Sequence, residues 1–342
     1  MFRYAKLDAN RTLEEAEQLY SARVGDAKRI YDKYAQQFVE RDCPICGSSK
    51  SKQGKPFRGT YKVSICETCG TPYVNPVPNP EALVDYYTNS TCREVYRKLV
   101  KRRNTGGASY VTDERVLKSL EALRGVTEDR PIRVLEVGSG SGHFLARLKE
   151  AVNTELPGRE IALIGLDLDI VSINNPADPD LDLQCLAAEE INSLEPNSFD
   201  LVAHFEFIEH LVDPYQFMSD VKKILRVGGK SVFTTPNIHS VEMKALDYNN
   251  YRLMAHAIFP PMHINAFGTM NMVHFVLRSG LKVVEIETPG RLDMDILTHS
   301  KDFFDDDGLK LMVALDEPTK ALLQHLMQLS RSSGVMSCVV EK

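Results

Sequence analysis

Hydrophobic and polar positions divide the chain into a helical, polar front part and a longer part built on apolar runs. In the front part, apolar residues recur at helical intervals over residues 12–40, which predicts one long helix. Thr12 and Glu15 have the spacing of a capping box at its start. Three shorter helices are predicted next, the first beginning near Pro80 and the others over 92–103 and 110–124.

From residue 132 onward, short apolar runs alternate with amphipathic stretches. The predicted strands are 132–137, 161–168, 181–187, 199–205, 230–235, 281–287 and 334–342. The predicted helices between them are 142–152, 214–229 and 269–279, and Gly228 and Gly229 are expected to end the second helix. This alternation predicts the α/β class with a mostly parallel sheet, in which ligands bind at the carboxyl ends of the strands.

The composition is that of an ordinary soluble globular protein, with 43% hydrophobic and 26% charged residues. We find no apolar stretch that suits a signal peptide or a membrane span, so we expect a cytoplasmic protein. Positive charge gathers in residues 1–130, with 23 Lys and Arg against 17 Asp and Glu, and residues 131–342 are acidic. The acidic main part argues against broad nucleic-acid binding, while the basic front part suits a small anionic partner.

Four cysteines form two Cys-x-x-Cys pairs, Cys43 with Cys46 and Cys66 with Cys69, at the spacing of a structural zinc site. The segment between the pairs is too polar to fold on its own hydrophobic content. We therefore expect a zinc ribbon over 41–78, in which a metal supplies the missing stability. Because all four ligands would be protein thiolates, the zinc ion should be structural and not catalytic.

A glycine loop follows the first strand of the alternation, in the stretch PIRVLEVGSGSGHF. A dinucleotide-binding loop needs a glycine where this chain has His143, and a nucleotide P-loop needs a lysine that the stretch lacks. Glu136 lies at the end of the strand, and Asp167 ends the next strand, where a carboxylate can accept hydrogen bonds from both ribose hydroxyls. The loop therefore suits a ligand with a ribose, no phosphate and a cationic part.

The stretch 131–289 resembles a class I S-adenosylmethionine-dependent methyltransferase. The resemblance rests on six ordered signatures: VLEVGSGSG, GLDLD, AAEEI, SFDLVAHFEFIEHLVDP, LRVGGKSVFTTPN and HINAF…VLRSGLKVVE. It implies S-adenosylmethionine as cofactor and a seven-stranded, mostly parallel Rossmann-like sheet in the order 3-2-1-4-5-7-6, whose antiparallel strand comes from the final residues.

The same resemblance implies which residues bind the cofactor. They are Glu136, Gly138, Ser139, Gly140, Gly142, Asp167, Leu168, Ala188, Glu189 and His204. In this set Glu136 and the glycines line the methionine portion, and Asp167 binds the ribose hydroxyls. Leu168 flanks the adenine with Ala188 and Glu189 near its rim, and His204 lies beside the sulfonium.

Catalysis can be assigned in three ways from the sequence. The stretch HFEFIEH places His204, Glu206, Glu209 and His210 at the mouth of the cofactor cleft, and His263 is expected to fold back over it. An oxygen or carbon nucleophile needs a base, which is His210 or His263 in the first interpretation. In the second, Glu206, Glu209, His210 and His263 hold Mg²⁺ or another divalent ion, as a two-Glu, His arrangement does in some oxygen-methylating relatives. In the third, Glu209 and His210 only shape the start of a helix.

A zinc ribbon ahead of a methyltransferase core resembles bacterial enzymes that methylate nucleotide-linked sugars. We therefore expect methyl transfer to an oxygen or carbon of a small-molecule acceptor, foremost an anionic nucleotide-linked or polysaccharide-precursor sugar. The alternative acceptor is a lipid, quinone or other natural product, and a zinc-ribbon RNA methyltransferase is a further alternative.

The expected domains follow from these assignments. They are an N-terminal helix over 1–40, the zinc ribbon over 41–78, a helical linker over 79–130 and the methyltransferase domain over 131–342, with a lid insertion at about 238–268. The amphipathic stretch 322–330 is a candidate surface for a homodimer, or alternatively simple core.

Overall fold

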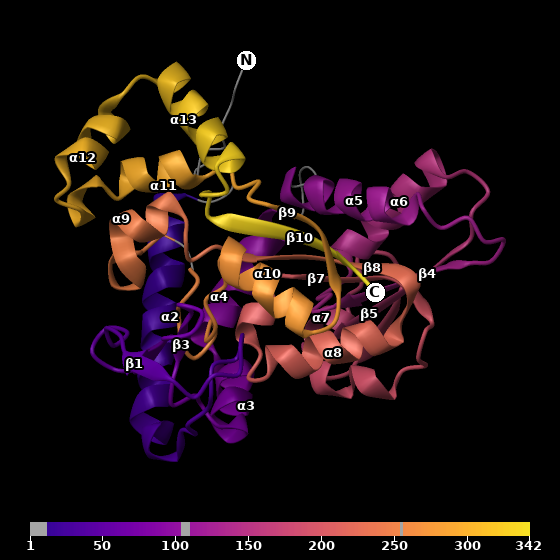
Figure 1. The fold of residues 1–342 in the computed structure, drawn as a ribbon, viewed down its shortest axis with the longest axis horizontal. Helices are drawn as coiled ribbons and strands as arrows, with labels where there is room; N and C mark the ends of the chain where they lie inside the picture. The colour runs from indigo at the N-terminus through magenta and orange to yellow at the C-terminus, as the bar shows by residue number, and fades with distance from the viewer. Residues whose placement is uncertain (1–11, 104–109, 254–255) are drawn as a thin grey trace.

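The computed structural model describes residues 12–103, 110–253 and 256–342, and its centre is a seven-stranded sheet (Figure 1). The strands are β4 (Ile132–Val137), β5 (Ile161–Asp167), β6 (Asp182–Cys185), β7 (Phe199–Phe205), β8 (Leu225–Pro236), β9 (Lys282–Glu287) and β10 (Val335–Glu341). They lie in the order β6-β5-β4-β7-β8-β10-β9. Strand β10 is antiparallel to both of its neighbours, and the other pairs are parallel. The predicted fold class and strand order are confirmed.

Helices cover both faces of this sheet. On one face lie α5 (Tyr110–Leu123) and α6 (His143–Glu155), and on the other lie α8 (Pro214–Ile224), α10 (Thr269–Arg278) and the 3₁₀ turn η2 (Ala188–Ser193). Two short segments at the carboxyl ends of the strands are α7 (Ile170–Ile173) and η3 (Ile208–His210). Leu148 and Val134 belong to the hydrophobic cluster on the first face, and Phe217 and Phe233 belong to the cluster on the second. The sheet is thus buried on both sides, as a parallel sheet requires.

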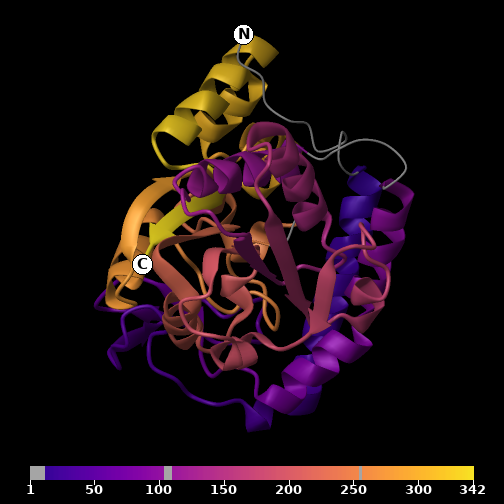
Figure 2. The same ribbon diagram turned by 90° about the vertical axis from the view of Figure 1, so that its right-hand side faces the viewer.

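The front part is a long helix with a small antiparallel sheet beside it. Its elements are α2 (Leu13–Tyr34), η1 (Ala35–Gln37), β1 (Ser51–Gln53), β2 (Val63–Cys66), β3 (Pro72–Val74), α3 (Pro80–Asn89) and α4 (Thr91–Arg103). The predicted capping box of Thr12 and Glu15 is present at the start of α2. Helices α2 and α4 lie side by side along one edge of the molecule (Figure 2).

The last part of the chain forms a group of helices above one end of the sheet (Figure 1). They are α9 (Val241–Asn250), α11 (Asp293–His299), η4 (Lys301–Phe303), α12 (Asp307–Ala314) and α13 (Glu317–Leu329). Leu297 and Met327 from these helices share a second hydrophobic core with Phe57 and Tyr61 of the front part and Phe259 of the predicted lid. This second core therefore joins segments that are far apart in the sequence.

Two predicted helix ends were wrong. Helix α8 ends at Ile224 and not at the glycines, because Leu225 already pairs with Phe199 of β7. The glycines continue β8 instead: the Lys342 N–H donates to the Gly229 carbonyl oxygen at 3.1 Å.

Helix α2 ends at Tyr34, before the predicted residue 40, and a 3₁₀ turn follows it. The reason is that Val39 is extended and exchanges two backbone hydrogen bonds of 2.9 Å with Val77. Among the helices of the described ranges, none combines the length and the apolar content needed to cross a bilayer.

Candidate active site

The glycine loop joins β4 to α6 at the carboxyl end of the sheet. Gly138, Gly140 and Gly142 have φ angles of 78°, 55° and 76°, a region that residues with a side chain rarely adopt. A Cβ at Gly138 would lie 2.7 Å from the Phe207 ring, and one at Gly142 would lie 2.6 Å from Leu181. A Cβ at Gly140 would meet no atom within 4 Å. Gly140 therefore borders open space, where a ligand can approach the backbone.

Two carboxylates flank this loop. Glu136 is buried, and its Oε2 has no hydrogen-bond partner in the described part of the chain. Burial raises the pKa of Glu136 well above its usual range. Asp167 accepts the Gly140 N–H at 2.8 Å and the Asp169 N–H at 2.7 Å, one on each carboxylate oxygen. Each of these oxygens keeps a lone pair for a further donor.

The remaining predicted cofactor residues surround the same end of the sheet. Ser139 follows the first glycine, and its hydroxyl has no partner among the described residues. Leu168, directly after Asp167, is 61% exposed, while Ala188 is buried and Glu189 is exposed.

These surroundings fit S-adenosylmethionine. A buried carboxylate oxygen without a partner suits the amino group of the methionine portion, and the open space at Gly140 lets that portion approach the backbone. The exposed leucine beside Asp167 suits a flat apolar ring attached to a ribose. The individual assignments of the cofactor residues stay predictions.

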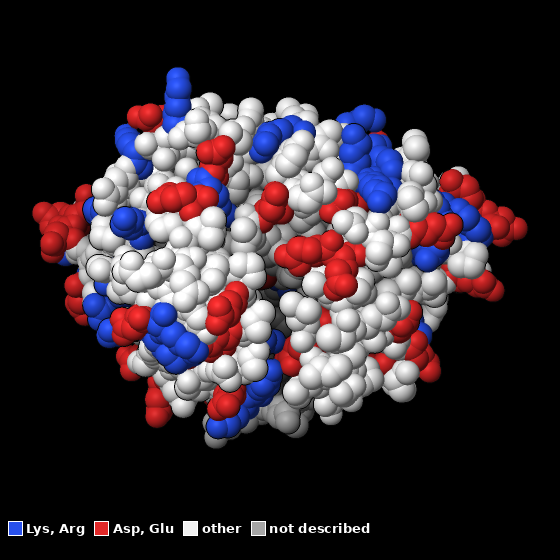
Figure 3. All heavy atoms as spheres, turned by 90° about the horizontal axis from the view of Figure 1, so that it is seen from below, with Lys and Arg blue, Asp and Glu red and all other residues white. Residues whose placement is uncertain are grey.

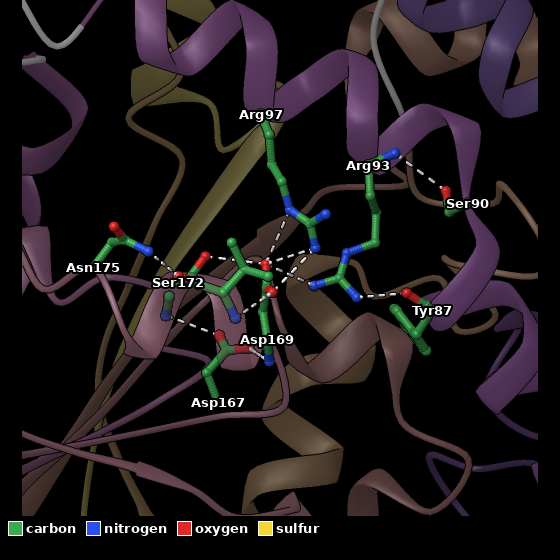
Figure 4. A network of polar contacts seen from close by, with 10 residues as sticks. Tyr87, Ser90, Arg93, Arg97, Asp167, Asp169, Ser172 and Asn175 are labelled. Carbon is green, nitrogen blue, oxygen red and sulfur yellow. Dashed lines mark hydrogen bonds and ion pairs between the residues drawn. The ribbon is translucent and has the colours of Figure 1, made fainter.

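Helix α4 is anchored beside the predicted ribose site (Figure 4). Arg97 Nη2 lies 3.0 and 3.1 Å from the two carboxylate oxygens of Asp169, and Arg93 Nη2 lies 3.2 Å from Asp169 Oδ2. Asp169 follows Asp167 by only two residues, so this contact joins the front part of the chain to the end of β5. In the space-filling view a hollow opens near the middle of one face, with Lys and Arg atoms and Asp and Glu atoms close to it (Figure 3).

Glu209, His210 and His263 come together beyond the carboxyl end of β7, with one potential ligand atom of each within 4.8 Å of the others. The first two belong to η3. The third is brought in because the N–H groups of Ile264 and Asn265 donate to the Glu209 carbonyl oxygen at 3.0 and 3.2 Å. The rings of His210 and His263 meet edge to face, 4.8 Å apart. His263 therefore lies against Glu209 and His210, and its place over the mouth of the cofactor cleft stays a prediction.

Burial controls the protonation of this cluster. The Glu209 side chain is fully buried, with Oε2 accepting the Thr235 hydroxyl at 2.9 Å and Oε1 lacking a hydrogen-bond partner among the described residues. Burial, and after it the charge of Glu206, raises the pKa of Glu209 well above its usual range. Burial also lowers the pKa of His210 to about 4 and that of His263 well below its usual value. Both imidazoles are therefore neutral near pH 7.

The hydrogen bonds of the two histidines fix their orientation. His263 Nδ1 lies 2.5 Å from the His256 carbonyl oxygen. Because a carbonyl only accepts, Nδ1 carries the proton and Nε2 keeps its lone pair. His210 Nδ1 lies 3.1 Å from the hydroxyl of Tyr87, a residue of α3.

Glu206 stands apart from these three residues. Its φ is +51°, and its Oε1 lies 3.7 Å from Arg115 Nη2. Arg115 also donates to the Thr234 hydroxyl at 3.1 Å. Of the four residues predicted to hold a divalent ion, the structure therefore brings three together and leaves Glu206 outside the converging group.

His204 lies inside an aromatic cage. Its ring stacks on Phe233 at 4.5 Å and meets the edges of Phe217 and Phe207, and the side chain is fully buried. Both ring nitrogens lack a partner among the described residues, and burial lowers the pKa of His204 to about 3. A place beside the sulfonium stays a prediction for this residue.

Sequence reasoning missed the contributions of the front helices. Tyr87 contacts the predicted residue His210 and Arg115 contacts the predicted residue Glu206, while Arg93 pairs with Asp169 and donates to the Tyr87 carbonyl oxygen at 2.9 Å. They lie on α3, α4 and α5, whose spacing indicates amphipathic helices and nothing more. Only the tertiary packing of these helices shows which side chains reach the site.

The four cysteines converge at the small sheet. Their Sγ atoms form one group, with 3.6 Å between Cys43 and Cys69 and 3.5 Å between Cys46 and Cys66. Tetrahedral Zn²⁺ with bonds of about 2.3 Å places its thiolates about 3.8 Å apart, so the arrangement fits this ion. The Thr71 hydroxyl lies 3.0 Å from Cys69 Sγ, in a position to orient that sulfur.

Comparison with known proteins identifies relatives. A family profile described as a methyltransferase domain matches residues 108–286. Curated relatives are ubiquinone biosynthesis O-methyltransferases: one from Neisseria meningitidis serogroup C is 28% identical over 120 residues, covering 34% of this chain and 50% of the relative. Another, from Burkholderia thailandensis, is 25% identical over 158 residues, covering 45% of this chain and 66% of the relative. The chain thus spans half to two thirds of the length of these relatives.

Solved structures are similar at lower identity. A S-adenosylmethionine-dependent methyltransferase from Mesorhizobium loti is 15% identical, with coverage of 65% of this chain and 96% of that chain and a TM-score of 0.43. The family profile spans a little more than half of the chain. The chain therefore belongs to the methyltransferase-domain family, and residues 108–286 are a class I, S-adenosylmethionine-dependent methyltransferase domain.

Proposed function

We propose that the protein transfers the methyl group of S-adenosylmethionine to a hydroxyl oxygen of a small-molecule acceptor. The observation that carries this proposal is the convergence of Glu209, His210 and His263 within 4.8 Å of one another. Phe207, two residues before Glu209, packs against the glycine loop at Gly138, so the cluster and the loop are neighbours. An oxygen nucleophile needs a group that takes its proton, and this cluster supplies one next to the proposed cofactor site.

His263 is the proposed base. Its Nε2 carries a lone pair because Nδ1–H is held by the His256 carbonyl oxygen. The acceptor hydroxyl would give its proton to Nε2 while its oxygen forms the new bond to the methyl carbon, and the bond between that carbon and the cofactor's sulfur would break, leaving S-adenosylhomocysteine. Oε1 of Glu209, which lacks a hydrogen-bond partner in the described part of the chain, lies 4.0 Å from His210 Nε2. Bound S-adenosylmethionine supplies the electrophilic methyl group.

A divalent ion is the competing interpretation of the same cluster. Neutral imidazoles and a carboxylate are the forms that ligate such ions, and three ligand atoms already converge. Glu206, the fourth predicted ligand, lies outside this converging group, which favours the base. Chelation decides between the two interpretations.

The acceptor is proposed by class only. The names of the curated relatives favour a quinone precursor or a similar hydroxylated ring, and the zinc-ribbon arrangement favours the nucleotide-linked sugar expected from the sequence. Both are hydroxyl-bearing small molecules, so both belong in the acceptor panel. The Cys43, Cys46, Cys66 and Cys69 group is proposed to hold a structural Zn²⁺.

The test is a labelled-methyl transfer assay read by mass spectrometry against hydroxybenzoates and nucleotide-linked sugars. We expect the label on oxygen, a loss of about 100-fold or more in kcat for His263→Asn, and little effect of EDTA. His274→Asn, which changes an exposed histidine of α10, is the matched control. Activity that EDTA abolishes and Mg²⁺ restores would support the ion instead. Full activity of His263→Asn would rule out the proposed base.

A further inference from the structure

The small antiparallel sheet is joined directly to the backbone that carries the proposed base. Residues 264–266 lie beside β3, with an antiparallel bridge between the two segments. The Val74 N–H of β3 donates to the Ile264 carbonyl oxygen at 2.9 Å. His263 is the residue directly before this segment. The small sheet therefore holds the chain at the position next to the base.

The side chain of Arg41 lies across this contact. Its Nε and Nη2 lie 3.3 and 3.2 Å from the Val74 carbonyl oxygen. The same Nη2 lies 3.1 Å from the Ile264 carbonyl oxygen and 2.9 Å from Asn265 Oδ1. Nη1 donates to the Val212 carbonyl oxygen at 2.8 Å. All of these acceptors are neutral oxygens, so the guanidinium is held here by the geometry of its planar set of donors.

These acceptors belong to both segments of the Glu209, His210 and His263 cluster. Val212 follows His210 by two residues, and Ile264 follows His263 directly. One guanidinium therefore binds a backbone oxygen close to each histidine. The distance between the two imidazole rings, 4.8 Å, depends on how these two backbone segments are spaced.

The side chain of Asn265 completes the connection. It is fully buried, and its Nδ2 donates to the Leu211 carbonyl oxygen at 2.7 Å while its Oδ1 accepts from Arg41. Without the arginine, this buried Oδ1 would lose that donor, and water or a movement of the segment would have to supply another. Loss of Arg41 should therefore loosen the contact between the two segments.

We propose that Arg41 is a positioning residue for methyl transfer, whose guanidinium fixes the spacing between the backbone segments of His210 and His263. The proposal rests on the proposed function, which makes His263 the base. Proton transfer requires the acceptor hydroxyl at hydrogen-bond distance from Nε2. A displacement of the base by about 1 Å can reduce the rate by on the order of 100-fold.

Arg41→Lys tests the proposal with kcat and cofactor affinity measured separately. Lysine keeps the charge but lacks the planar set of donors that reaches both segments at once. We expect kcat to fall at least about tenfold, while the Kd of S-adenosylhomocysteine in calorimetry changes by less than about twofold. Arg278→Lys is the matched control, because Arg278 joins α10 to the small sheet through a different backbone oxygen, that of Ile45, at 3.0 Å. Wild-type kcat in a folded Arg41→Lys protein would overturn the proposal.

A double variant separates positioning from a general structural role. Because Arg41 is proposed to act through His263, Arg41→Lys should cost little more in a protein that already carries His263→Asn. Two losses of kcat that multiply would show an effect independent of the base and would refute the positioning role. The single variant His263→Asn reports on the proposed function alone, so the two failures are distinguishable.

Hydrogen exchange read by mass spectrometry gives a measurement that needs no turnover. We expect Arg41→Lys to speed the exchange of residues 264–266 at least about tenfold and to leave β4 and β7 unchanged. Unchanged exchange at 264–266, or faster exchange throughout the main sheet, would contradict the proposal. If Arg41→Lys does not fold, Asn265→Ala serves as the second variant, because it removes one acceptor of Arg41 and the bond to Leu211. The same fall in kcat and the same local rise in exchange are then expected.

Discussion

Glu136 shows at the scale of one residue how a binding site differs from a packed core. A buried carboxylate normally has its acceptors satisfied, yet Oε2 of Glu136 has no partner among the described residues, and its pKa is raised by burial. Such a group destabilises the fold unless something outside the chain uses it. Because Glu136 lies beside the glycine loop, we propose that the cationic part of the cofactor uses this oxygen.

We expect Glu136→Gln to weaken S-adenosylmethionine binding by about tenfold or more, because a hydrogen bond to a charged group is worth about 1.5–3 kcal/mol. The melting temperature of the free protein should stay equal or rise, since a neutral amide replaces a buried acid. Calorimetry and thermal unfolding measure the two effects. Glu160→Gln, an exposed change before β5, is the control. Unchanged cofactor affinity with normal folding would contradict the assignment of Glu136.

At the scale of elements, every strand of the main sheet could be predicted, and all except β8 to within two residues at each end. Strands β4 and β7 have the predicted bounds, because their apolar runs are flanked by turn residues. The end of α8 could not be predicted, because LRVGG reads equally well as a helix terminus and only its pairing with β7 and the last residue makes it a strand.

The residues of the candidate site also fall into those that could be located from the sequence and those that could not. Residues that follow a strand, such as Asp167 and Glu209, could be located from the sequence, because parallel strands gather their carboxyl ends. Tyr87 and Arg93 could not, because they reach this end of the sheet only through the docking of α3 and α4. The Asp169 contacts with Arg93 and Arg97 are part of that docking.

We expect the stability of the small antiparallel sheet to depend on the proposed zinc ion. Cys43→Ser should abolish zinc binding and lower the melting temperature, because Cys43 and Ile45 share one hydrophobic core with Phe267 and Met272 beside the main sheet. Elemental analysis and thermal unfolding check both effects. Cys185→Ser, at an exposed position of β6, is the control. A normal melting curve for a zinc-free Cys43→Ser protein would show that the metal is dispensable.

At the scale of the whole molecule, a buried polar cluster connects the C-terminal helices to the active site. Glu242 of α9 lies 3.1 Å from His256 Nε2, and the His256 carbonyl oxygen holds His263. A Cβ at Gly334, just before β10, would clash with Glu242 and lie 3.3 Å from Asp293, so the two acids border the same glycine. The position of the proposed base therefore depends on packing that includes the last strand of the chain.

This cluster predicts how stability changes with pH. Burial raises the pKa of Glu242 to about 8, above its ordinary value of 4.5, so the folded protein holds this proton more tightly than the unfolded chain does. Stability from Glu242 is therefore present below about pH 4.5 and is lost as the pH rises through about 8. The glutamine in Glu242→Gln cannot ionise, so this loss of stability is absent from the variant. Burial lowers the pKa of His256 to about 3, which makes stability fall toward low pH; wild type and variant share this effect, so it cancels when their melting temperatures are compared.

We expect the wild type and Glu242→Gln to melt at similar temperatures at pH 5, and Glu242→Gln to melt about 5 °C or more higher at pH 8. The groups near Glu242 also include Tyr251 and Asp293. Burial raises the pKa of Asp293 to about 6, so both proteins also lose stability from Asp293 as the pH rises through about 6, below the range of Glu242. Thermal unfolding at intervals from pH 5 to 8 measures the difference, with Glu121→Gln on the exposed face of α5 as control. Parallel curves for wild type and Glu242→Gln would show that Glu242 is ionised in the folded protein throughout, and the cluster would then be a charged pair of Glu242 with His256.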